Sequence, residues 1–294
     1  MILRLGERRF ELQKGAPLVM GIVNASPESF SDGGRWATLD DQVERALELV
    51  AEGAHVIDVG GESGVTGIAA IAADEETRRV VPLVERLARE GVTVSVDTWK
   101  AEVARAALAA GAVLINDVSG LRDPALADAC AEAGAGLVVM HTRAEPKVKE
   151  FANYDDVVAD VVEFVSERMR AALEHGVEEE RIVVDPGPDF AKTPAQTVEV
   201  LRALDRLAEL GRPILLAVSR KDFVGALTGR PPREREAGTL AAIGAGVDAG
   251  AAIVRVHDVA ATVDFLTVRA ALAGERDVDP ELRLPDKLRT QRAA

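Results

Sequence analysis

Eight short apolar runs divide this chain, and each ends on a polar residue that could bind a ligand. The runs are rich in Val, Ile and Leu without strict alternation, which is typical of strands buried on both faces of a parallel sheet. They cover Val19–Asn24, His55–Asp58, Val92–Asp97, Val113–Asp117, Gly136–His141, Ile182–Asp185, Ile214–Lys221 and Ala252–Asp258. Because the carboxyl ends of parallel strands meet at one edge, we expect their polar ends to share one rim.

Helix-like stretches fill the intervals between these runs. They cover Leu39–Glu52, Asp74–Glu90, Ala101–Ala110, Pro124–Ala133, Tyr154–Glu174, Pro194–Leu210, Gly238–Ala249 and Val259–Ala271. Eight strand–helix pairs in 294 residues fit the roughly 250 residues of a (β/α)₈ barrel. The first strand is not followed by a Gly-x-Gly-x-x-Gly turn, which disfavours an open dinucleotide-binding sheet. The expected fold class is α/β, a single (β/α)₈ TIM barrel.

Local signals mark the ends of the helices. Asp40, Asp123 and Thr193 are the expected N-caps, the last of them followed by a proline at the first helical position. A glycine that suits a left-handed C-terminal cap follows seven helices, at Gly53, Gly91, Gly111, Gly134, Gly176, Gly211 and Gly250.

The two ends of the chain differ from the repeating pattern. Ile2–Leu12 alternates around Gly6-Glu7-Arg8-Arg9, which predicts a short N-terminal β-hairpin that closes the bottom of the barrel. Residues 275–294 are charged and contain two prolines, so we expect a partly disordered tail after one domain spanning residues 1–274.

Composition restricts the partners and the location of the protein. A net charge of −14 argues against nucleic acid or an anionic membrane as a partner. Cys130 is the single cysteine, so the chain cannot form an internal disulfide. With no membrane-spanning run and no signal-peptide pattern, a cytoplasmic location is expected.

The expected rim has an unusual inventory of side chains. It comprises Asn24, Asp58, Asp97, Asn116, His141, Asp185, Lys221, Arg255 and His257. The acceptors and amide of Asp97, Asn116 and Asp185 suit a flat heterocycle with several N–H donors. Cationic donors accompany them, at Arg220, Lys221, Arg255 and His257. Since Arg255 and His257 are two residues apart on a strand, they point to one side. The set predicts a polar heterocycle that carries an anionic group.

Two loops extend this prediction. Gly60–Gly67 is glycine-rich and resembles a mobile lid or a backbone cradle for an anion. Asn24–Gly34 holds an aromatic residue, Phe30, which could clamp a ligand. At the start of that loop, Asn24 is a hypothetical Mg²⁺ ligand, because Mg²⁺ commonly binds diphosphate through few protein ligands.

These motifs together resemble one family, the dihydropteroate synthases, which are pterin-binding enzymes of folate biosynthesis. Asn24–Gly34 resembles the first signature of the family and Asp58–Ser63 the second. Further motifs follow in the family's order, at Ser95–Thr98, Ile115–Val118, Met140-His141, Asp185–Gly187, Ser219–Lys221 and Arg255–Asp258. The resemblance runs from about residue 18 to residue 270.

The resemblance implies a transferase that joins p-aminobenzoate to (7,8-dihydropterin-6-yl)methyl diphosphate with Mg²⁺, giving 7,8-dihydropteroate and diphosphate. It implies a pterin diphosphate site at Asn24, Asp97, Asn116, Met140, Asp185, Lys221, Arg255 and His257. It implies a p-aminobenzoate site at Phe30, Ser63, Thr66, Phe190, Ser219 and Arg220. Of these, Asp97, Lys221, Arg255 and His257 would be catalytic and Asn24 would bind the metal. Family members are expected to be homodimers.

The residues suit this reaction. Cleavage of the C–O bond leaves positive charge on the pterin, which Asp97 and Asp185 can stabilise, and negative charge on diphosphate, which Arg255, His257 and Mg²⁺ can stabilise. The neutral arylamine needs positioning more than activation. No covalent enzyme intermediate is expected.

Two departures from the family pattern leave alternatives open. Gly64-Val65-Thr66-Gly67 stands where the family usually has Thr-Arg-Pro-Gly, and Pro188-Asp189 precedes Phe190 in place of an apolar residue and glycine. They predict altered affinity for sulfonamides, which mimic p-aminobenzoate. The alternative functions are a catalytically silent pterin-binding paralogue and a methyltransferase that uses a methylfolate and a corrinoid protein. The cationic rim disfavours the methyltransferase, because that reaction handles no diphosphate.

Overall fold

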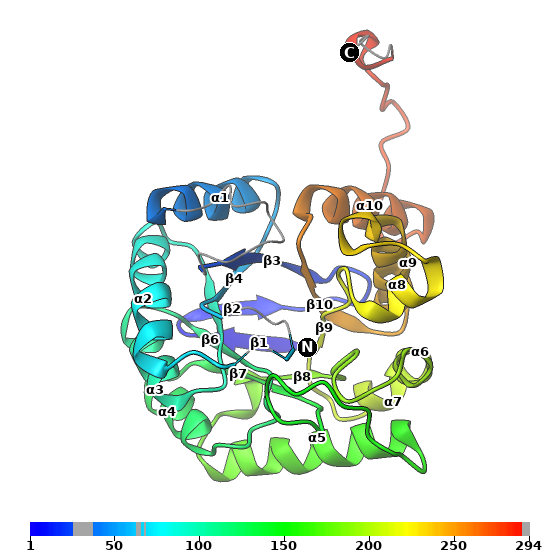
Figure 1. Ribbon diagram of the computed structural model, residues 1–294. Helices are drawn as coiled ribbons and strands as arrows, with labels where there is room; N and C mark the ends of the chain where they lie inside the picture. Colours follow the sequence, from blue (N-terminus) through cyan, green and yellow to red (C-terminus); the bar gives the residue numbers. More distant parts are fainter. Residues whose placement is uncertain (26–37, 63–65, 68, 290–294) are drawn as a thin grey trace.

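Eight parallel strands close into a barrel in a computed structural model that describes residues 1–25, 38–62, 66–67 and 69–289 (Figure 1). The strands pair in the order β10-β3-β4-β5-β6-β7-β8-β9. They span Leu18–Asn24 (β3), Val56–Gly60 (β4), Val94–Asp97 (β5), Leu114–Asp117 (β6), Gly136–Met140 (β7), Ile182–Asp185 (β8), Ile214–Leu216 (β9) and Ala251–Val256 (β10). The predicted (β/α)₈ barrel is confirmed.

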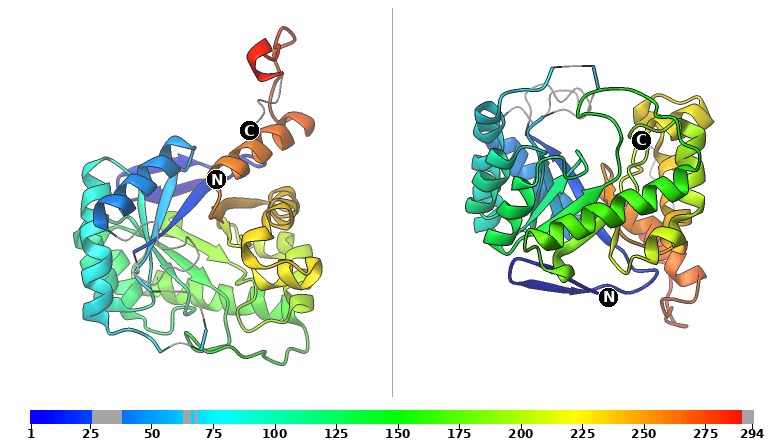
Figure 2. Two further views of the ribbon diagram at one scale, coloured as in Figure 1. Left: turned by 45° about the horizontal axis from the view of Figure 1, so that its top comes forward. Right: turned by 90° about the horizontal axis from the view of Figure 1, so that it is seen from below.

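Helices surround the barrel and cover its outer face (Figure 2). They span Leu39–Ala51 (α1), Ala73–Arg89 (α2), Ala101–Ala109 (α3), Ala125–Ala133 (α4), Val157–Glu174 (α5), Pro194–Arg202 (α6), Leu204–Ala208 (α7), Asp222–Thr228 (α8), Glu236–Asp248 (α9) and Val259–Leu272 (α10). Short 3₁₀ helices lie at Glu179–Arg181 (η2), Pro232–Glu234 (η3) and Asp286–Leu288 (η4). No helix in the described ranges is long and apolar enough to cross a membrane.

The seventh strand–helix unit differs most from its prediction. The expected strand Ile214–Lys221 already ends at Leu216, and the short helix α8 follows it where no helix was expected. The chain turns at Arg220, whose φ of 59° is left-handed and therefore incompatible with a strand. The expected helix Pro194–Leu210 is divided at Ala203 into α6 and α7.

Helix ends follow the local signals at most positions. The seven predicted glycines all have positive φ, between 59° and 111°. Thr193 caps α6 with a capping box to Gln196, as predicted. For α1 the prediction is wrong, because Thr38, two residues before Asp40, accepts the N–H of Asp41. The N-cap position of α4 is Pro124, although Asp123 Oδ1 accepts the N–H of Ala125.

The N-terminal hairpin closes one end of the barrel, as predicted (Figure 2). Its strands are Ile2–Leu5 (β1) and Arg8–Glu11 (β2), paired antiparallel. Leu3 and Leu5 are fully buried and belong to an internal core cluster with barrel residues Met20, Val56, Leu114, Val138, Val183, Leu215 and Ile253. The opposite end, where the parallel strands finish, remains for ligands.

Candidate active site

Arg255 lies at the centre of a polar cluster at the carboxyl ends of the strands. From β10 it donates Nε to Asp58 Oδ2 on β4 at 2.6 Å and Nη2 to Asp97 Oδ2 on β5 at 2.8 Å. Asn116 on β6 donates its amide to the same Asp58 oxygen at 3.1 Å. Since β10 pairs only with β3 and β9, these contacts cross the barrel mouth. The predicted convergence of Asp97, Asn116 and Arg255 is thus found.

The two carboxylates in this cluster differ in exposure. Asp58 is fully buried, and its Oδ1 has no hydrogen-bond partner among the described residues. The Asp97 side chain keeps 24% of its exposure. Burial and the nearby Asp58 charge raise the pKa of Asp97 to about 7, against the opposing effect of Arg255. The cluster therefore offers acceptors for ring N–H groups. One of these acceptors, Asp97, can exchange a proton near neutral pH.

Asp185 and Lys221 form a second part of the rim. Asp185 ends β8 and accepts the N–H of Gly187 at 2.7 Å. Burial raises its pKa to about 6. Lys221 Nζ lies 4.3 Å from the ring centroid of Phe190, and burial lowers its pKa. Within the described part of the chain, no hydrogen bond or ion pair of Lys221 Nζ is found, so this nitrogen can donate to a ligand.

Ser219 and His257 form a third part. Ser219 Oγ lies 2.9 Å from His257 Nδ1 and accepts the backbone N–H of His257 at 3.3 Å. A hydroxyl that donates to Nδ1 leaves the ring proton on Nε2, which can then donate to an anion. Burial, followed by the charges of Arg220 and Arg255, lowers the pKa of His257 to about 3. A pKa this low favours a neutral His257 ring in the free protein, in contrast to the cationic donor that the sequence predicted.

Residues between β9 and α8 are held by groups that the sequence analysis missed. Arg235 Nη1 donates to the carbonyls of Arg220 at 2.8 Å and Lys221 at 3.1 Å. The N–H of Arg220 donates to Thr239 Oγ1 at 3.1 Å. The buried Nε of Arg220 has no partner in the described ranges, which leaves a donor for a ligand.

His141 does not face the barrel mouth, where the sequence analysis expected it. It follows the last residue of β7, is fully buried and lies 2.8 Å through Nε2 from Asp160 Oδ1 on α5. Its ring centroid is 5.0 Å from that of Phe164, also on α5. The side chain thus points to the helix layer rather than into the mouth. Met140, one residue earlier, aligns with Asp185 in the β7–β8 register.

Two further predicted residues that the structure describes belong to β3 and to the loop after β4. Asn24 ends β3, and its Oδ1 would be 3.7 Å from a Cβ at Gly60. Thr66 is exposed in the loop after β4. The predictions for Phe30 and Ser63 lie outside the described residues. No group of three or more His, Cys, Asp or Glu suited to a metal ion is found in the part that is described.

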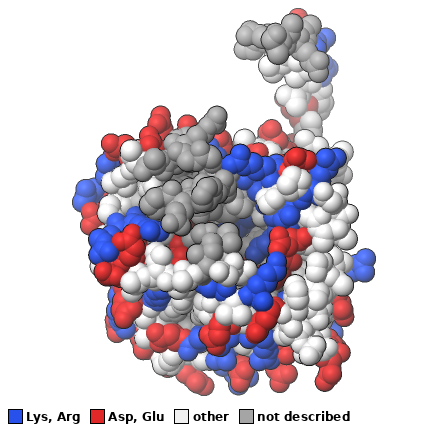
Figure 3. Space-filling view, viewed as in Figure 1, with Lys and Arg blue, Asp and Glu red and all other residues white. Residues whose placement is uncertain are grey.

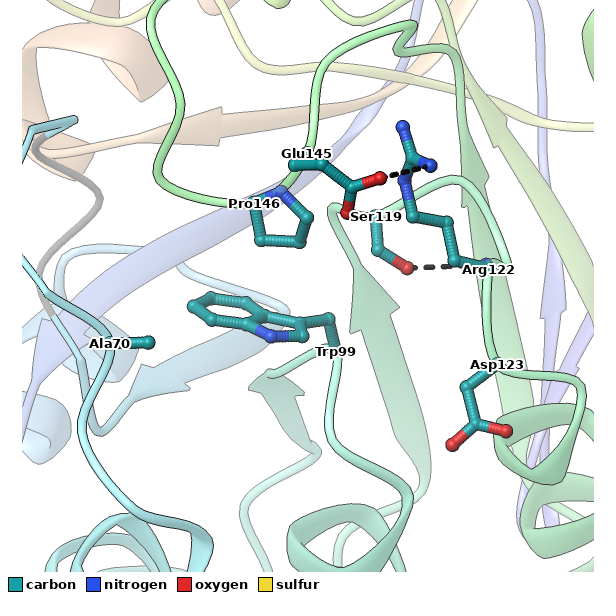
Figure 4. Close-up of a pocket in the computed structure, with 7 residues that line it drawn as sticks. All are labelled: Ala70, Trp99, Ser119, Arg122, Asp123, Glu145 and Pro146. Atoms are coloured by element: carbon teal, nitrogen blue, oxygen red, sulfur yellow. Dashed lines mark hydrogen bonds and ion pairs between the residues drawn. The ribbon is translucent and has the colours of Figure 1, made fainter.

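A cavity of about 280 Å³ opens in the loops after β4 to β7 (Figure 4). It is lined by Ala70, Trp99, Ser119, Arg122, Asp123, Glu145 and Pro146. Arg122 is engaged by Glu145 at 2.8 Å. None of the predicted site residues lines it, so it is distinct from the Arg255 cluster. On the face shown in Figure 3, residues of both charges are interspersed.

Sequence comparisons identify relatives of the chain. The family model of pterin binding enzymes matches residues 20–257. A dihydropteroate synthase of Bacillus subtilis is 45% identical over 248 residues, which cover 84% of this chain and 85% of that protein. One from Mycobacterium leprae is 46% identical over 262 residues, covering 86% and 92%.

Solved structures of dihydropteroate synthases are also similar to this chain. A Xanthomonas albilineans dihydropteroate synthase with 4-aminobenzoic acid has a TM-score of 0.85 at 47% identity, covering 92% of this chain and 98% of that one. The same enzyme in complex with 7,8-dihydropteroate has a TM-score of 0.83 at 46% identity, covering 93% and 99%. A Yersinia pestis dihydropteroate synthase with a sulfonamide drug has a TM-score of 0.87 at 36% identity, covering 94% and 100%.

Proposed function

This chain belongs to the pterin-binding enzyme family and, within it, to the dihydropteroate synthases of folate biosynthesis, and from this premise we propose which of its residues perform the transfer. The reaction joins p-aminobenzoate to (7,8-dihydropterin-6-yl)methyl diphosphate and releases diphosphate. The observation that best supports the assignment of roles is the Arg255 guanidinium, held between Asp58 and Asp97 across the barrel mouth.

In this proposal the pterin lies among the acceptors at the strand ends. Asp97, Asn116 and Asp185 read its ring N–H and amino groups, and Lys221 donates to a ring acceptor. The full proposed set for the pterin diphosphate is Asn24, Asp97, Asn116, Met140, Asp185, Lys221, Arg255 and His257. A carboxyl with a pKa near 7, as at Asp97, can stabilise positive charge on the ring when it is ionised.

Diphosphate departs on the side of Arg255 and His257. Arg255 carries a permanent charge, and the neutral His257 ring can donate from Nε2 without the cost of being protonated. These donors stabilise the negative charge that develops as the C–O bond breaks. Asp97, Lys221, Arg255 and His257 are the proposed catalytic residues, because each would touch the pterin diphosphate.

We propose Mg²⁺ as the cofactor and Asn24 as its protein ligand. The amide oxygen of Asn24 is a hard donor at the end of β3, beside Gly60 where no side chain fills the space. One such ligand fits an ion held mainly by diphosphate oxygens and water. When bound, Mg²⁺ would neutralise charge on the leaving group. Asn24→Ala should weaken Mg²⁺ binding, so the Mg²⁺ concentration that gives the half-maximal rate should rise.

The p-aminobenzoate site is proposed beside Phe190 and Lys221. Its members are Phe30, Ser63, Thr66, Phe190, Ser219 and Arg220, of which Phe30 and Ser63 lie outside the described residues. The free Nε of Arg220 suits a carboxylate. Because Gly64-Val65 replaces the usual loop residues, sulfonamide inhibition should differ from that of a synthase with the usual loop, and identical inhibition constants would contradict this.

A steady-state assay tests the proposal. The protein with both substrates and Mg²⁺ should form dihydropteroate and complement a strain that lacks the synthase. Arg255→Gln should abolish the rate, whereas Arg269→Gln, which removes ion pairs with Asp248 and Glu275 away from the barrel mouth, should not. Pterin binding without any product would instead support the silent paralogue. Methyl transfer from a methylfolate would support the methyltransferase.

Assembly, domain limits and location complete the proposal. We propose one domain over residues 1–274 with a tail at 275–294, and a homodimer formed through outer-wall helices, where Val268 and Leu272 of α10 are 59% and 85% exposed. Light scattering should give twice the 31.2 kDa of one chain. A cytoplasmic location also remains a proposal, tested by cell fractionation.

A further inference from the structure

Lys192 is a buried lysine that the proposed reaction does not use. It is 1% exposed and heads the largest fully buried side chains. Its Nζ lies 2.6 Å from His141 Nδ1 and donates to the carbonyls of Gly187 at 3.0 Å and Phe190 at 3.2 Å. Burying a lysine away from water is strongly unfavourable unless its donors are satisfied. Here three acceptors converge on one nitrogen, which indicates a built site rather than accidental burial.

The lysine is anchored to the helix layer through His141. Asp160 on α5 accepts from His141 Nε2 at 2.8 Å and is held from the other side by Arg143, at 3.1 and 2.8 Å. A carboxylate can only accept, so Nε2 carries the ring proton and Nδ1 is the acceptor for Lys192. Burial lowers the pKa of His141 to about 3, which keeps the ring neutral as this arrangement requires.

The two carbonyls that Lys192 holds belong to a strained turn. Gly187, Asp189 and Ala191 all have positive φ, at 63°, 66° and 53°. For Asp189 and Ala191, which carry a Cβ, this region is sterically disfavoured. Gly187 O also accepts the N–H of Phe190 at 3.1 Å, so Lys192 Nζ closes both ends of the same turn. Such a conformation persists only where its surroundings determine it.

This turn lies between a residue of the proposed pterin site, Asp185, and a residue of the proposed p-aminobenzoate site, Phe190. At its start, the N–H of Gly187 donates to Asp185 Oδ1 at 2.7 Å. At its end, the Phe190 ring lies 4.3 Å from Lys221 Nζ. Asp185 is also fixed by β8, whose last residue it is. Phe190 lies outside any strand or helix, so its position depends on the turn.

We propose that Lys192 is a positioning residue for the second substrate: held by His141, it fixes the Gly187–Phe190 turn and thereby places the Phe190 ring against Lys221, at the proposed p-aminobenzoate site. The inference rests on the proposed function for its substrate. The restraint of the turn by Lys192 is independent of the proposed function. Lys192 itself is 1% exposed, so it offers almost no surface to a substrate.

The test replaces Lys192 with methionine, which keeps most of the volume and removes the donors. For Lys192→Met we expect KM for p-aminobenzoate to rise about tenfold, with KM for the pterin diphosphate changed less than about twofold. Amide hydrogen exchange of residues 186–192 should become at least about tenfold faster. Lys192→Arg, which keeps donors toward both carbonyls, should recover part of the p-aminobenzoate effect.

Two further variants separate positioning from general stability. Arg181 is also buried and donates to backbone carbonyls, those of Gly6 and Gly134, but at the hairpin end of the barrel. Arg181→Met should lower the Tm and leave KM for both substrates unchanged. His141→Phe keeps a ring beside Phe164 but removes the Nδ1 acceptor. It should raise KM for p-aminobenzoate in the same direction as Lys192→Met.

The outcomes distinguish this inference from the proposed function. If Lys192→Met keeps both the wild-type KM for p-aminobenzoate and the wild-type exchange of the turn, Lys192 is not a positioning residue. Equal rises in KM for both substrates would also overturn the inference, since they indicate a structural role. If the wild type makes no dihydropteroate, the proposed function fails, and hydrogen exchange in Lys192→Met still decides whether Lys192 restrains the turn.

Discussion

Asp58 on β4 accepts Nε of Arg255 on β10 at 2.6 Å, across the intervening strand β3. The carboxylate is fully buried, whereas the Arg255 side chain keeps 19% of its exposure. The pairing orients the guanidinium plane, and Asp97 accepts from Nη2, whereas no partner of Nη1 is found among the described residues. A buried charge pair of this kind costs most when one partner alone is removed. Asp58 therefore positions a catalytic residue without needing to touch the substrate.

We predict that Asp58→Asn lowers kcat/KM for the pterin diphosphate about 100-fold, equivalent to about 3 kcal/mol. The neutral amide cannot hold the guanidinium as firmly as the charge-assisted bond does. KM for p-aminobenzoate should stay within about twofold, because Arg255 is proposed to serve the pterin diphosphate only. Steady-state kinetics with each substrate varied in turn provides the measurement.

Asp117→Asn is the matched control. Asp117 is also a buried carboxylate at a strand end, but it accepts the N–H groups of Ser119 at 2.7 Å and Leu121 at 2.6 Å. It should lower the Tm without changing either KM. Wild-type kinetics in Asp58→Asn would show that the Arg255 pair has no positioning role.

Asp189, which stands where the family usually has glycine, makes hydrogen bonds to two neighbouring helices. Its φ of 66° is one that glycine adopts more easily, yet its carboxylate accepts the N–H of Phe223 in the first turn of α8 at 3.2 Å and the hydroxyl of Thr197 on α6 at 3.2 Å. We predict that Asp189→Gly raises KM for p-aminobenzoate about three- to tenfold, because α8 begins directly after Lys221. Kinetics and the Tm are measured together.

Ala191→Gly is the control that distinguishes the relief of backbone strain from the loss of the Asp189 carboxylate. Ala191 has a similar φ of 53° two residues later in the same turn, and its methyl group makes no hydrogen bond. The substitution relieves strain without removing an acceptor, so KM should not change. An Asp189→Gly enzyme with unchanged KM would mean that the carboxylate serves stability alone.

The barrel and most of its rim could be predicted because they depend on local pattern. Runs of Val, Ile and Leu buried on both faces, glycines after helices and polar strand ends are all visible in one sequence. The alternation of side chains along a strand is a further signal, which the sequence analysis applied only to Arg255 and His257. Successive strand residues point to opposite sides, so Met140 and His141 cannot both face the mouth, and neither can Asn116 and Asp117.

Long-range pairing could not be predicted in the same way. Arg255 and Asp58 are 197 residues apart, and any of several rim carboxylates could have been the partner. Lys192 has no apolar pattern around it that announces burial. Its environment exists only after β7, β8 and α5 have packed. The helix α8 was missed because seven residues that include Gly225 give too weak a helical period.

The N-terminal hairpin should contribute to stability and not to catalysis. Leu5 is fully buried in the internal cluster at the closed end, and its Cδ2 would be 2.6 Å from a Cβ at Gly136, which shows how tightly it packs. We predict that Leu5→Ala lowers the free energy of unfolding by about 2 to 5 kcal/mol, with unchanged KM values. Urea unfolding is the measurement, and Leu47→Ala, at a side chain 37% exposed, should cost less than about 1 kcal/mol.

Titration of Asp185 should make stability depend on pH in a defined window. Burial raises the pKa of this carboxyl from 3.8 to about 6, so the folded protein binds its proton more tightly than the unfolded chain does. The resulting stabilisation is complete below pH 3.8 and is lost as the pH rises to about 6. Over this interval the loss amounts to up to about 3 kcal/mol, since one pKa unit corresponds to about 1.4 kcal/mol.

Asp185→Asn removes this titration, because asparagine stays neutral at every pH. The free energy of unfolding of the variant, relative to that of the wild type, should therefore rise between pH 4 and pH 7 by about 2 to 3 kcal/mol, even though dihydropteroate formation is lost. Urea unfolding of the ligand-free proteins at several pH values measures the difference, with Asp205→Asn as a control for the removal of an exposed carboxylate. A difference that is constant, or that falls with pH, would show that Asp185 does not hold its proton in the folded state and is available as an anion before the pterin binds.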